Sequence, residues 1–368
     1  MDSFLAVGLM SGTSLDGIDA ALIETDGAHH VRPIAFRGEP YSDRAREQLR
    51  AAAKLALVCE RPRQEFDILT ASEMLTRSHI LAVRKLLTDA RVAPADVRVI
   101  GFHGQTIAHR PERGWTWQIG DGAAMAAALR IEVVDDFRSA DVAAGGQGAP
   151  LLPVYHSALV SGMEKPVAVL NVGGVSNLTW MGEGPDDLVA FDTGPGNALI
   201  DDWMLETTGR RYDEGGAFAA TGRIDEAVLA AMLDNPWFAA PPPKSLDRAD
   251  FTVEPVRGLA PADGAVTLTA FTAISISYGL RLLPARPKRL IVAGGGRHNG
   301  VLMAMLKAAC GIAPEPMEAI GWNGDATEAE GFAYMAVRAL AGLPISFPGT
   351  TGVPAPQAGG VLHRVPQL

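Results

Sequence analysis

The feature that most constrains the fold is a pair of glycine-turn hairpins, one in each half of the chain. In each half an apolar run meets a glycine turn and a second apolar run follows: Phe4–Met10, Ser11–Gly17 and Ile18–Thr25 in the first half, and Val167–Val172, Gly173-Gly174 and Ser176–Met181 in the second. Apolar runs separated by such turns are typical of β-hairpins. Two similar hairpins predict a duplicated architecture.

Around these hairpins, strand-like and helix-like segments alternate along the chain. Apolar residues recur at helical spacing in 42–58, 64–90, 122–129, Arg223–Leu233, Thr267–Leu283, His298–Ala309 and Glu328–Leu340. Short apolar runs predict further strands at Val97–His103, Thr116–Ile119, Ile131–Val134, Leu188–Phe191 and Arg289–Ala293. Residues 234–264 and 344–368 are rich in Pro and Gly and predict irregular structure. The pattern indicates a mixed α/β sheet in each half.

The bulk properties point to a two-domain globular protein. A chain of 368 residues exceeds the usual size of one hydrophobic core. The periodicity breaks at the glycine-rich stretch Gly145–Pro150, so we predict domains at 1–140 and 141–368, with the last helix free to pack back on the first domain. The net charge of −10 argues against a nucleic-acid partner.

Location and assembly are constrained only weakly. The N-terminus lacks the basic region and long apolar run of a signal peptide, and no apolar run is long enough to span a membrane. Two cysteines, Cys59 and Cys310, make no metal-type spacing. We therefore expect a cytoplasmic protein without a membrane partner, and a homodimer is compatible with the sequence.

The first candidate site is the hairpin turn Gly12–Asp19. Its glycines let backbone N–H groups approach a phosphate, and Thr13 and Ser14 add hydroxyl donors. Either Asp16 or Asp19 could hold Mg²⁺. The loop has no Gly-Lys-Ser/Thr, so it is not a P-loop. An ordinary hairpin turn is the alternative.

Two further candidate sites follow strands in the second half. Asp192 stands at a strand end in Phe191–Asn197, just before a helix, where a carboxylate can take a proton from a hydroxyl or water. The alternative is a turn-forming Asp192 with Asn197 as a helix cap. Gly294-Gly295-Gly296 follows an apolar strand and would let a nucleotide lie on bare backbone, although close packing of helix on strand explains the glycines equally well.

A fourth candidate site combines His103–Thr106 with Gly145–Pro150. Both stretches offer hydrogen bonds suited to a polyhydroxylated ligand. Arg138 could contact that ligand or pair with Asp135. A buried, satisfied His103 is the alternative, and an acid such as Glu330 on the last helix is more often a solvated helix residue than a ligand.

The combination of motifs resembles the anhydro-N-acetylmuramic acid kinases of the actin/Hsp70/sugar-kinase superfamily. The resemblance covers nearly the whole chain in order. It is carried by Gly8–Asp19, Gly104–Thr106, Asp141–Pro150, Asn171–Asn177, Phe191–Asn197, Gly294–Gly296 and Glu330-Gly331.

The resemblance implies two actin-like (ribonuclease H-like) lobes of mixed sheets flanked by helices, with the active site in the cleft between them. ATP would lie on Gly12, Thr13, Ser14, Leu15, Asp16, Gly17, Ile18, Asp19, Asn171, Gly173, Gly174, Gly294, Gly295 and Gly296. The sugar would lie on His103, Gln105, Thr106, Arg138, Gly146, Gln147, Gly194 and Asn197. Asp192 would be the catalytic base and Glu330 a second acid, with Asp16 and Glu330 at the Mg²⁺.

The reaction that this resemblance implies belongs to cell-wall recycling. Water opens the 1,6-anhydro ring of 1,6-anhydro-N-acetylmuramic acid, and ATP phosphorylates the freed O6. A kinase of another anhydrosugar such as levoglucosan, or a non-catalytic ATP- and sugar-binding protein of actin-like fold, remain the alternatives.

Overall fold

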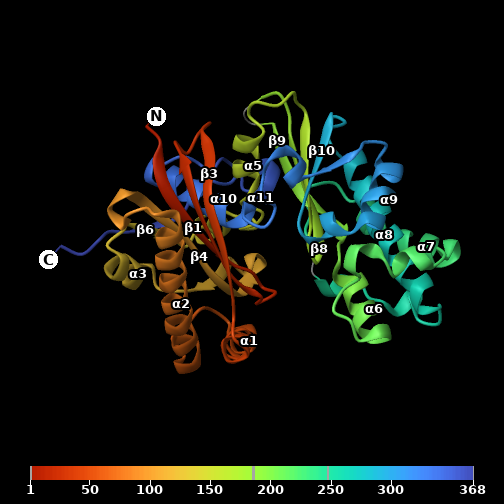
Figure 1. Cartoon of the computed structure of the whole chain (residues 1–368), viewed down its shortest axis with the longest axis horizontal. Helices are drawn as coiled ribbons and strands as arrows, with labels where there is room; N and C mark the ends of the chain where they lie inside the picture. The colour runs from red at the N-terminus through yellow and green to blue at the C-terminus, as the bar shows by residue number, and fades with distance from the viewer. Residues whose placement is uncertain (1, 185–186, 247, 368) are drawn as a thin grey trace. The chain divides into compact units, whose positions relative to one another are not determined.

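The computed structural model describes residues 2–184, 187–246 and 248–367 (Figure 1). The chain divides into two compact units, one made of Met1–Ser161 with Asp325–Leu368 and the other of Gly162–Gly324. The division after Ser161 lies further along the chain than the predicted boundary after residue 140. The last segment of the chain belongs to the first unit.

The first unit is built on a sheet of seven strands in the order β12-β6-β4-β1-β2-β3, with β5 pairing to β4. Strands β1, β4 and β6 are parallel, while β2, β3, β5 and β12 pair antiparallel with their neighbours. The strands are β1 Phe4–Ser11, β2 Gly17–Thr25, β3 Val31–Pro40, β4 Val97–Arg110, β5 Trp115–Ile119, β6 Val133–Asp135 and β12 Val361–His363.

The second unit repeats this arrangement in a sheet of five strands, ordered β11-β10-β7-β8-β9. Three antiparallel strands again stand at one side, and parallel strands continue from the first of them. The strands are β7 Val167–Val172, β8 Val175–Met181, β9 Leu188–Pro195, β10 Arg289–Ala293 and β11 Pro314–Pro316. The common strand order confirms the predicted duplication and the mixed α/β class.

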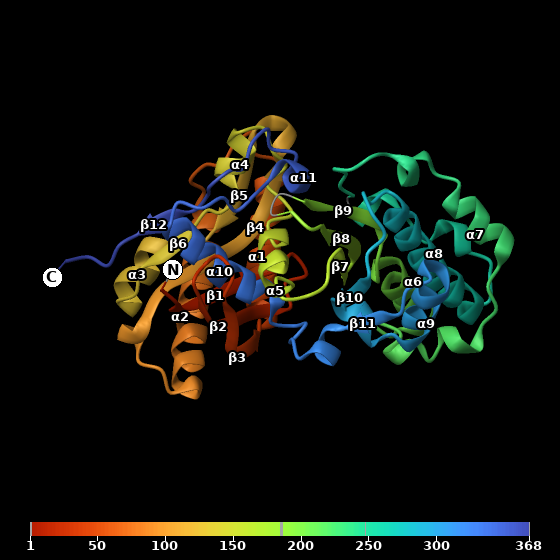
Figure 2. The same ribbon diagram turned by 90° about the horizontal axis from the view of Figure 1, so that it is seen from above.

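Helices cover both faces of the first sheet. The apolar side chains of α1 Asp43–Leu57, α2 Phe66–Ala90 and α3 Gly122–Leu129 form one core with one face of the strands. On the other face lie α5 Pro153–Leu159 and α10 Thr327–Leu340 (Figure 2). A Cβ at Gly8 would stand 1.8 Å from the carbonyl oxygen of Ala329, so glycine lets α10 pack directly on β1. The short helices α4 Ser139–Ala143 and α11 Pro348–Thr351 complete this unit.

In the second unit one long helix connects two cores. Helix α8, Pro261–Arg281, contacts the sheet and α9 Gly300–Cys310 through one set of apolar residues. Through another set it packs against α6 Ala198–Thr208 and α7 Glu226–Leu233. Much of 234–260 is irregular, with short 3₁₀ turns at Pro236–Ala239, Arg248–Asp250 and Glu254–Val256. The predicted irregular stretch of 234–264 therefore ends too late, because α8 begins at Pro261.

The structure corrects several predicted boundaries. Strand β4 does not end at His103 but runs through Gly104–Thr106 to Arg110, because β5 pairs with this stretch. Strand β9 likewise continues through Asp192, which the sequence placed in a turn. Strands β3, β11 and β12 were not predicted. Among the described residues, we find no helix with the length and apolar character of a membrane span.

Candidate active site

The first glycine loop joins β1 to β2 and points its polar side chains outward. Leu15 is buried with a φ of 60°, and its N–H donates to the carbonyl of Gly12 at 3.1 Å. Thr13, Ser14 and Asp16 are exposed. A Cβ at Gly12 would meet only the Ser14 hydroxyl, at 3.6 Å. The loop therefore offers hydroxyls beside open backbone, the arrangement that a phosphate requires.

Gln105, predicted to contact the sugar, is bonded to this loop. The Ser11 hydroxyl donates to Gln105 Oε1 at 2.6 Å, and Gln105 Nε2 donates to the carbonyl of Gly12 at 3.2 Å. Ser11 also shares a hydrogen bond of 2.8 Å with the Tyr41 hydroxyl. Because both ends of its amide are engaged within the protein, Gln105 positions the glycine loop.

Asp19, on β2 behind the loop, lies among other carboxylates. Burial raises its pKa to about 6, and repulsion from Glu328, Asp325 and Asp16 adds to the rise. A cation would relieve this repulsion, and Mg²⁺ commonly takes one or two carboxylates together with phosphate oxygens. Within the described ranges, no group of three or more His, Cys, Asp or Glu side chains has metal-binding geometry. The fit to Mg²⁺ therefore rests on the charge of these four acids.

Glu330, predicted as the second acid and a metal ligand, is buried in the first unit and hydrogen-bonded to Tyr155. It is 4% exposed, and the Tyr155 hydroxyl donates to its Oε2 at 2.6 Å. Burial raises the pKa of Glu330. Residues two apart on a helix do not share a face. The acid of α10 that acts on Asp19 is Glu328, which sequence reasoning missed.

His103 and Arg138 form one buried network in the first unit. Two guanidinium nitrogens of Arg138 donate to His103 Nε2 at 3.1 and 3.0 Å, and a third donates to the carbonyl of Gly148 at 2.8 Å. His103 Nδ1 donates to the carbonyl of Gly104 at 2.9 Å. Burial and the Arg138 charge hold the pKa of His103 well below its usual value. His103 is therefore a neutral imidazole with its proton on Nδ1.

A pocket of about 310 Å³ lies beside this network. Its wall combines His103 and Gln118 with Trp117, Asp136 and Ser139, a mixture of polar groups and an aromatic face that suits a sugar.

The other predicted sugar residues of the first unit lie around these elements. Thr106 accepts a hydrogen bond from Gln118 Nε2 at 3.1 Å. A Cβ at Gly146 would press against the Asp141 carboxylate at 2.2 Å, and the N–H of Gln147 donates to the carbonyl of Thr351 at 2.7 Å. These contacts fix the glycine-rich stretch 145–148.

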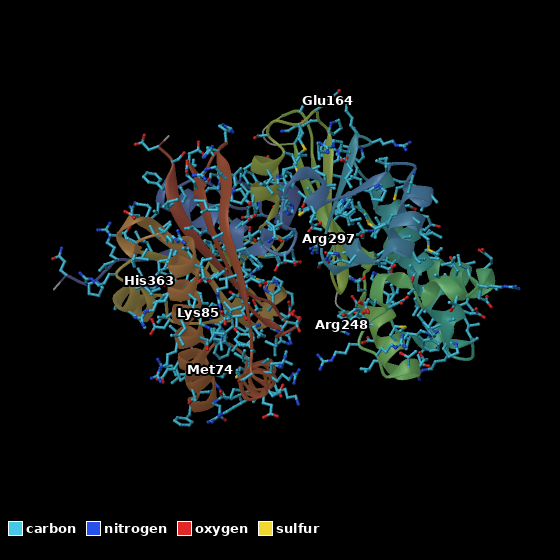
Figure 3. All side chains as sticks on the ribbon, viewed as in Figure 1. Met74, Lys85, Glu164, Arg248, Arg297 and His363 are labelled. Atoms are coloured by element: carbon cyan, nitrogen blue, oxygen red, sulfur yellow. The ribbon has the colours of Figure 1, made fainter. Side chains whose placement is uncertain are left out.

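Asp135 does not pair with Arg138. It bonds to His363 Nε2 at 2.9 Å, and His363 is labelled in Figure 3. The short strand β12 therefore ties the C-terminal segment to an acid that also lines the 310 Å³ pocket.

Asp192 lies in the second unit, on β9, opposite Asn177 of β8. The N–H of Leu246 donates to its carboxylate at 2.8 Å, and its own N–H donates to the carbonyl of Lys244 at 3.0 Å. Burial raises the pKa of Asp192 to about 6. A carboxylate with this pKa is ionised at neutral pH and still basic enough to take a proton efficiently, as a general base requires.

The second glycine turn, between β7 and β8, is open above both of its glycines. A Cβ at Gly173 or Gly174 would come no closer than 3.6 Å to any neighbour. Their carbonyls accept from the N–H groups of Asn197 at 2.7 Å and Gly196 at 2.9 Å, which joins the turn to the start of α6. The turn therefore leaves room for a ligand on bare backbone.

The three glycines after β10 have different roles. A Cβ at Gly294, where φ is +74°, would meet Asn171 Oδ1 at 2.5 Å, and one at Gly296 would meet Val172 at 2.4 Å. Both are required by packing, so the packing explanation holds for them. Gly295 is open and lines a pocket of about 480 Å³.

Two residues predicted to bind the sugar have other surroundings. Asn197 lines the same 480 Å³ pocket as Gly295 and donates to the carbonyl of Val172 at 3.0 Å. Gly194 packs against α8, because a Cβ there would lie 2.7 Å from the Ser275 hydroxyl. The structure thus places Asn197 with the predicted nucleotide residues of the second unit.

Known proteins resemble this chain over its full length. The family model described as anhydro-N-acetylmuramic acid kinase matches residues 4–364. A protein of that name from Rhizorhabdus wittichii is 71% identical over 364 residues, covering 99% of this chain and 100% of the relative. One from Zymomonas mobilis is 54% identical over 365 residues, covering 98% and 100%.

This chain belongs to the anhydro-N-acetylmuramic acid kinase family. Membership confirms the predicted resemblance and its class, that of a kinase. The fold agrees with it: component A of the (R)-2-hydroxyglutaryl-CoA dehydratase of Acidaminococcus fermentans aligns at a TM-score of 0.50 with 11% identity, covering 92% of this chain and 99% of that one. The duplicated mixed sheets are those of the actin-like fold.

Family motifs alone left two acids unassigned. Glu328 of α10 acts on Asp19, and Asp201 of α6 lines the 480 Å³ pocket. The helical period does not separate Glu328 from Glu330, because each shares its face with buried apolar residues, Glu328 with Phe332 and Glu330 with Ala333 and Tyr334. The same period could have singled out Asp201 over its neighbour Asp202, because Asp201 lies four residues after the predicted site residue Asn197.

Proposed function

We propose that this protein uses ATP to convert 1,6-anhydro-N-acetylmuramic acid into N-acetylmuramic acid 6-phosphate during recycling of the cell wall. The family membership supports the kinase class and the sugar. The observation that carries the mechanism is the desolvated Asp192, a carboxylate poised as a base on a strand that adjoins the open glycine turn.

Each unit, taken by itself, offers an open glycine turn that suits part of a nucleotide. The open backbone at Gly12 and Gly173-Gly174 would receive phosphates, and Gly295 with its pocket would receive the adenosine. Asp16, Asp19 and Glu328 would hold Mg²⁺, which when bound offsets the negative charge of the phosphates.

Asp192 would then take a proton from a water molecule as that water attacks the anomeric carbon. The bond from this carbon to the bridging oxygen breaks, and its electron pair stays on O6. O6 attacks the γ-phosphorus and ADP leaves. Positioning of the three reactants supplies most of the acceleration in such a transfer.

The neutral His103 fits the sugar side of this reaction. With its proton on Nδ1 and Nε2 occupied by Arg138, it does not compete with Asp192 for the water proton. Asp192 is therefore the base to which we assign the reaction.

The proposal is tested by measuring ADP formation with a panel of sugars. We expect ATP turnover with 1,6-anhydro-N-acetylmuramic acid, weak turnover with levoglucosan and none with N-acetylmuramic acid, which has no 1,6-anhydro bridge. Turnover that favours levoglucosan would assign another anhydrosugar, and ATP hydrolysis unaffected by any sugar would overturn the kinase assignment.

Gly12→Val is expected to weaken ATP binding about tenfold or more without unfolding the protein. The valine side chain would fill the open space in which a phosphate oxygen accepts hydrogen bonds from the loop. Isothermal titration calorimetry with ATP measures the effect. Gly162→Val is the matched control, since a Cβ at Gly162 meets nothing within 4 Å, one at Gly12 meets only the Ser14 hydroxyl at 3.6 Å, and Gly162 lies outside the glycine loops. Equal ATP affinity in the two folded variants would remove Gly12 from the phosphate site.

A further inference from the structure

The 480 Å³ pocket of the second unit contains a carboxylate to which the described residues donate no hydrogen bond. The pocket lies between the start of α6, the loop 212–215 and the connection from β10 to α9. Asn197, Ile200 and Asp201 of α6 line it at the spacing of one helix face. Within the described part of the chain, Asp201 has electrostatic contact with Asp202 and Arg248 but no side-chain hydrogen bond.

Two neighbouring polar groups of the pocket, Asp213 and Asn299, are already paired, and Tyr212, Glu214 and His298 also line it. Asp213 accepts from the N–H groups of Phe218 and Ala219 at 2.8 and 2.9 Å. Asn299 Oδ1 caps α9. Among the described residues, Arg248 (Figure 3) is the cation that lowers the pKa of Asp201, and it donates to Asp202 at 2.7 Å. The carboxylate of Asp201 is therefore able to accept a hydrogen bond from a ligand.

We propose that Asp201 accepts a hydrogen bond from a ribose hydroxyl of ATP and makes this site select ribonucleotides over deoxyribonucleotides. This inference rests on the proposed function, which brings ATP to Gly295 in the same pocket. A half-buried carboxylate without a donor has lost part of its hydration, and an O–H group restores it with a charge-assisted hydrogen bond.

The charge of the pocket decides which part of the nucleotide lies there. Asp201, Asp213 and Glu214 together disfavour phosphate oxygens. Burial and the Asp202 charge raise the pKa of Asp201 to about 6, so it is an anion at neutral pH. A neutral group rich in hydroxyl donors fits these walls, and the ribose is the part of ATP with that chemistry.

A double-mutant cycle between residue and ligand tests the contact. The dissociation constants of ATP, 2′-deoxyATP and 3′-deoxyATP are measured by calorimetry for the wild type, Asp201→Ala and Asp201→Asn. Asp202→Ala is the matched control, because Asp202 is adjacent, exposed and paired with Arg248. The KM for the sugar is recorded in parallel.

We expect the wild type to bind one of the two deoxynucleotides about 10- to 100-fold more weakly than ATP. Asp201→Ala should weaken ATP by the same factor, leave that deoxynucleotide unchanged and leave the KM for the sugar unchanged. Asp201→Asn, which keeps one acceptor but no charge, should lie between them, and Asp202→Ala should match the wild type.

Different failures have different meanings. Wild-type protein that binds ATP and both deoxynucleotides equally would overturn the ribose contact alone. The ribose contact would also be overturned if Asp201→Ala weakened ATP and the deoxynucleotides by the same factor, because the two changes would then be independent. A raised KM for the sugar in Asp201→Ala would assign the carboxylate to the sugar instead. A folded wild type that binds no nucleotide would overturn the proposed function together with this inference.

Discussion

Replacing Asp192 with Asn is expected to lower kcat by about 10²–10⁴-fold, the usual contribution of a general base. The amide cannot take the water proton, yet its oxygen can still accept from the N–H of Leu246. ATP affinity should stay near the wild-type value. Steady-state ADP release and calorimetry with ATP measure the two quantities.

The pH dependence adds a second readout. Because burial raises the pKa of Asp192 to about 6, kcat of the wild type should rise as pH increases through about 6 and then level off. The residual kcat of Asp192→Asn should not show this rise, which we call the acid limb of the pH profile. Asp202→Asn, an exposed acid in the same unit, should keep both the rate and the limb.

Stability separates a chemical role from a structural one. The native pKa of Asp192 lies above the ordinary value of 3.8, so its ionisation costs folding free energy as pH rises through about 6. Asp192→Asn should therefore melt no lower than the wild type at pH 8. A variant with near-normal kcat, or one that loses activity only because it unfolds, would remove Asp192 as the base.

The fold follows from the sequence wherever apolar periodicity is strong. Both hairpins, the long helices α2 and α8 and the parallel strands β7 and β10 were predicted. The strands β7 and β10 are short apolar runs that are buried almost throughout, and apolar residues recur at helical spacing in α2. The edge strand β3 was missed, since charged and proline residues occur along it as they commonly do at sheet edges.

Turn-forming residues misled the prediction at the candidate site. Asp192 to Pro195 have the composition of a turn, but β8 on one side and the backbone of Lys244 on the other hold them extended. Local propensity yields to such pairing. The site therefore has Asp192 on a strand, where its position is fixed more firmly than a turn would fix it.

The role of each acid depends on contacts that cross the chain. Glu330 is bonded to Tyr155, 175 positions away, and Glu328 acts on Asp19 from the opposite end of the chain. Neither contact leaves a mark in the local sequence around α10. The role of Glu330 as a second acid therefore stays a prediction, and the influence of Glu328 on Asp19 is added to it.

Ring opening coupled to phosphoryl transfer is the central claim. In 1,6-anhydro-N-acetylmuramic acid, O6 bridges to the anomeric carbon, so a plain kinase would find no free hydroxyl there. Water must enter at the anomeric carbon, and the oxygen transferred onto phosphorus must be the substrate's own O6.

A single turnover in ¹⁸O-labelled water, analysed by mass spectrometry of the product, tests this claim most directly. Product formed in ordinary water and held in labelled water for the same time corrects for exchange of the anomeric oxygen. We predict one label at the anomeric hydroxyl and none in the phosphate. Label in the phosphate, or a phosphorylated product that retains its anhydro ring, would contradict the account.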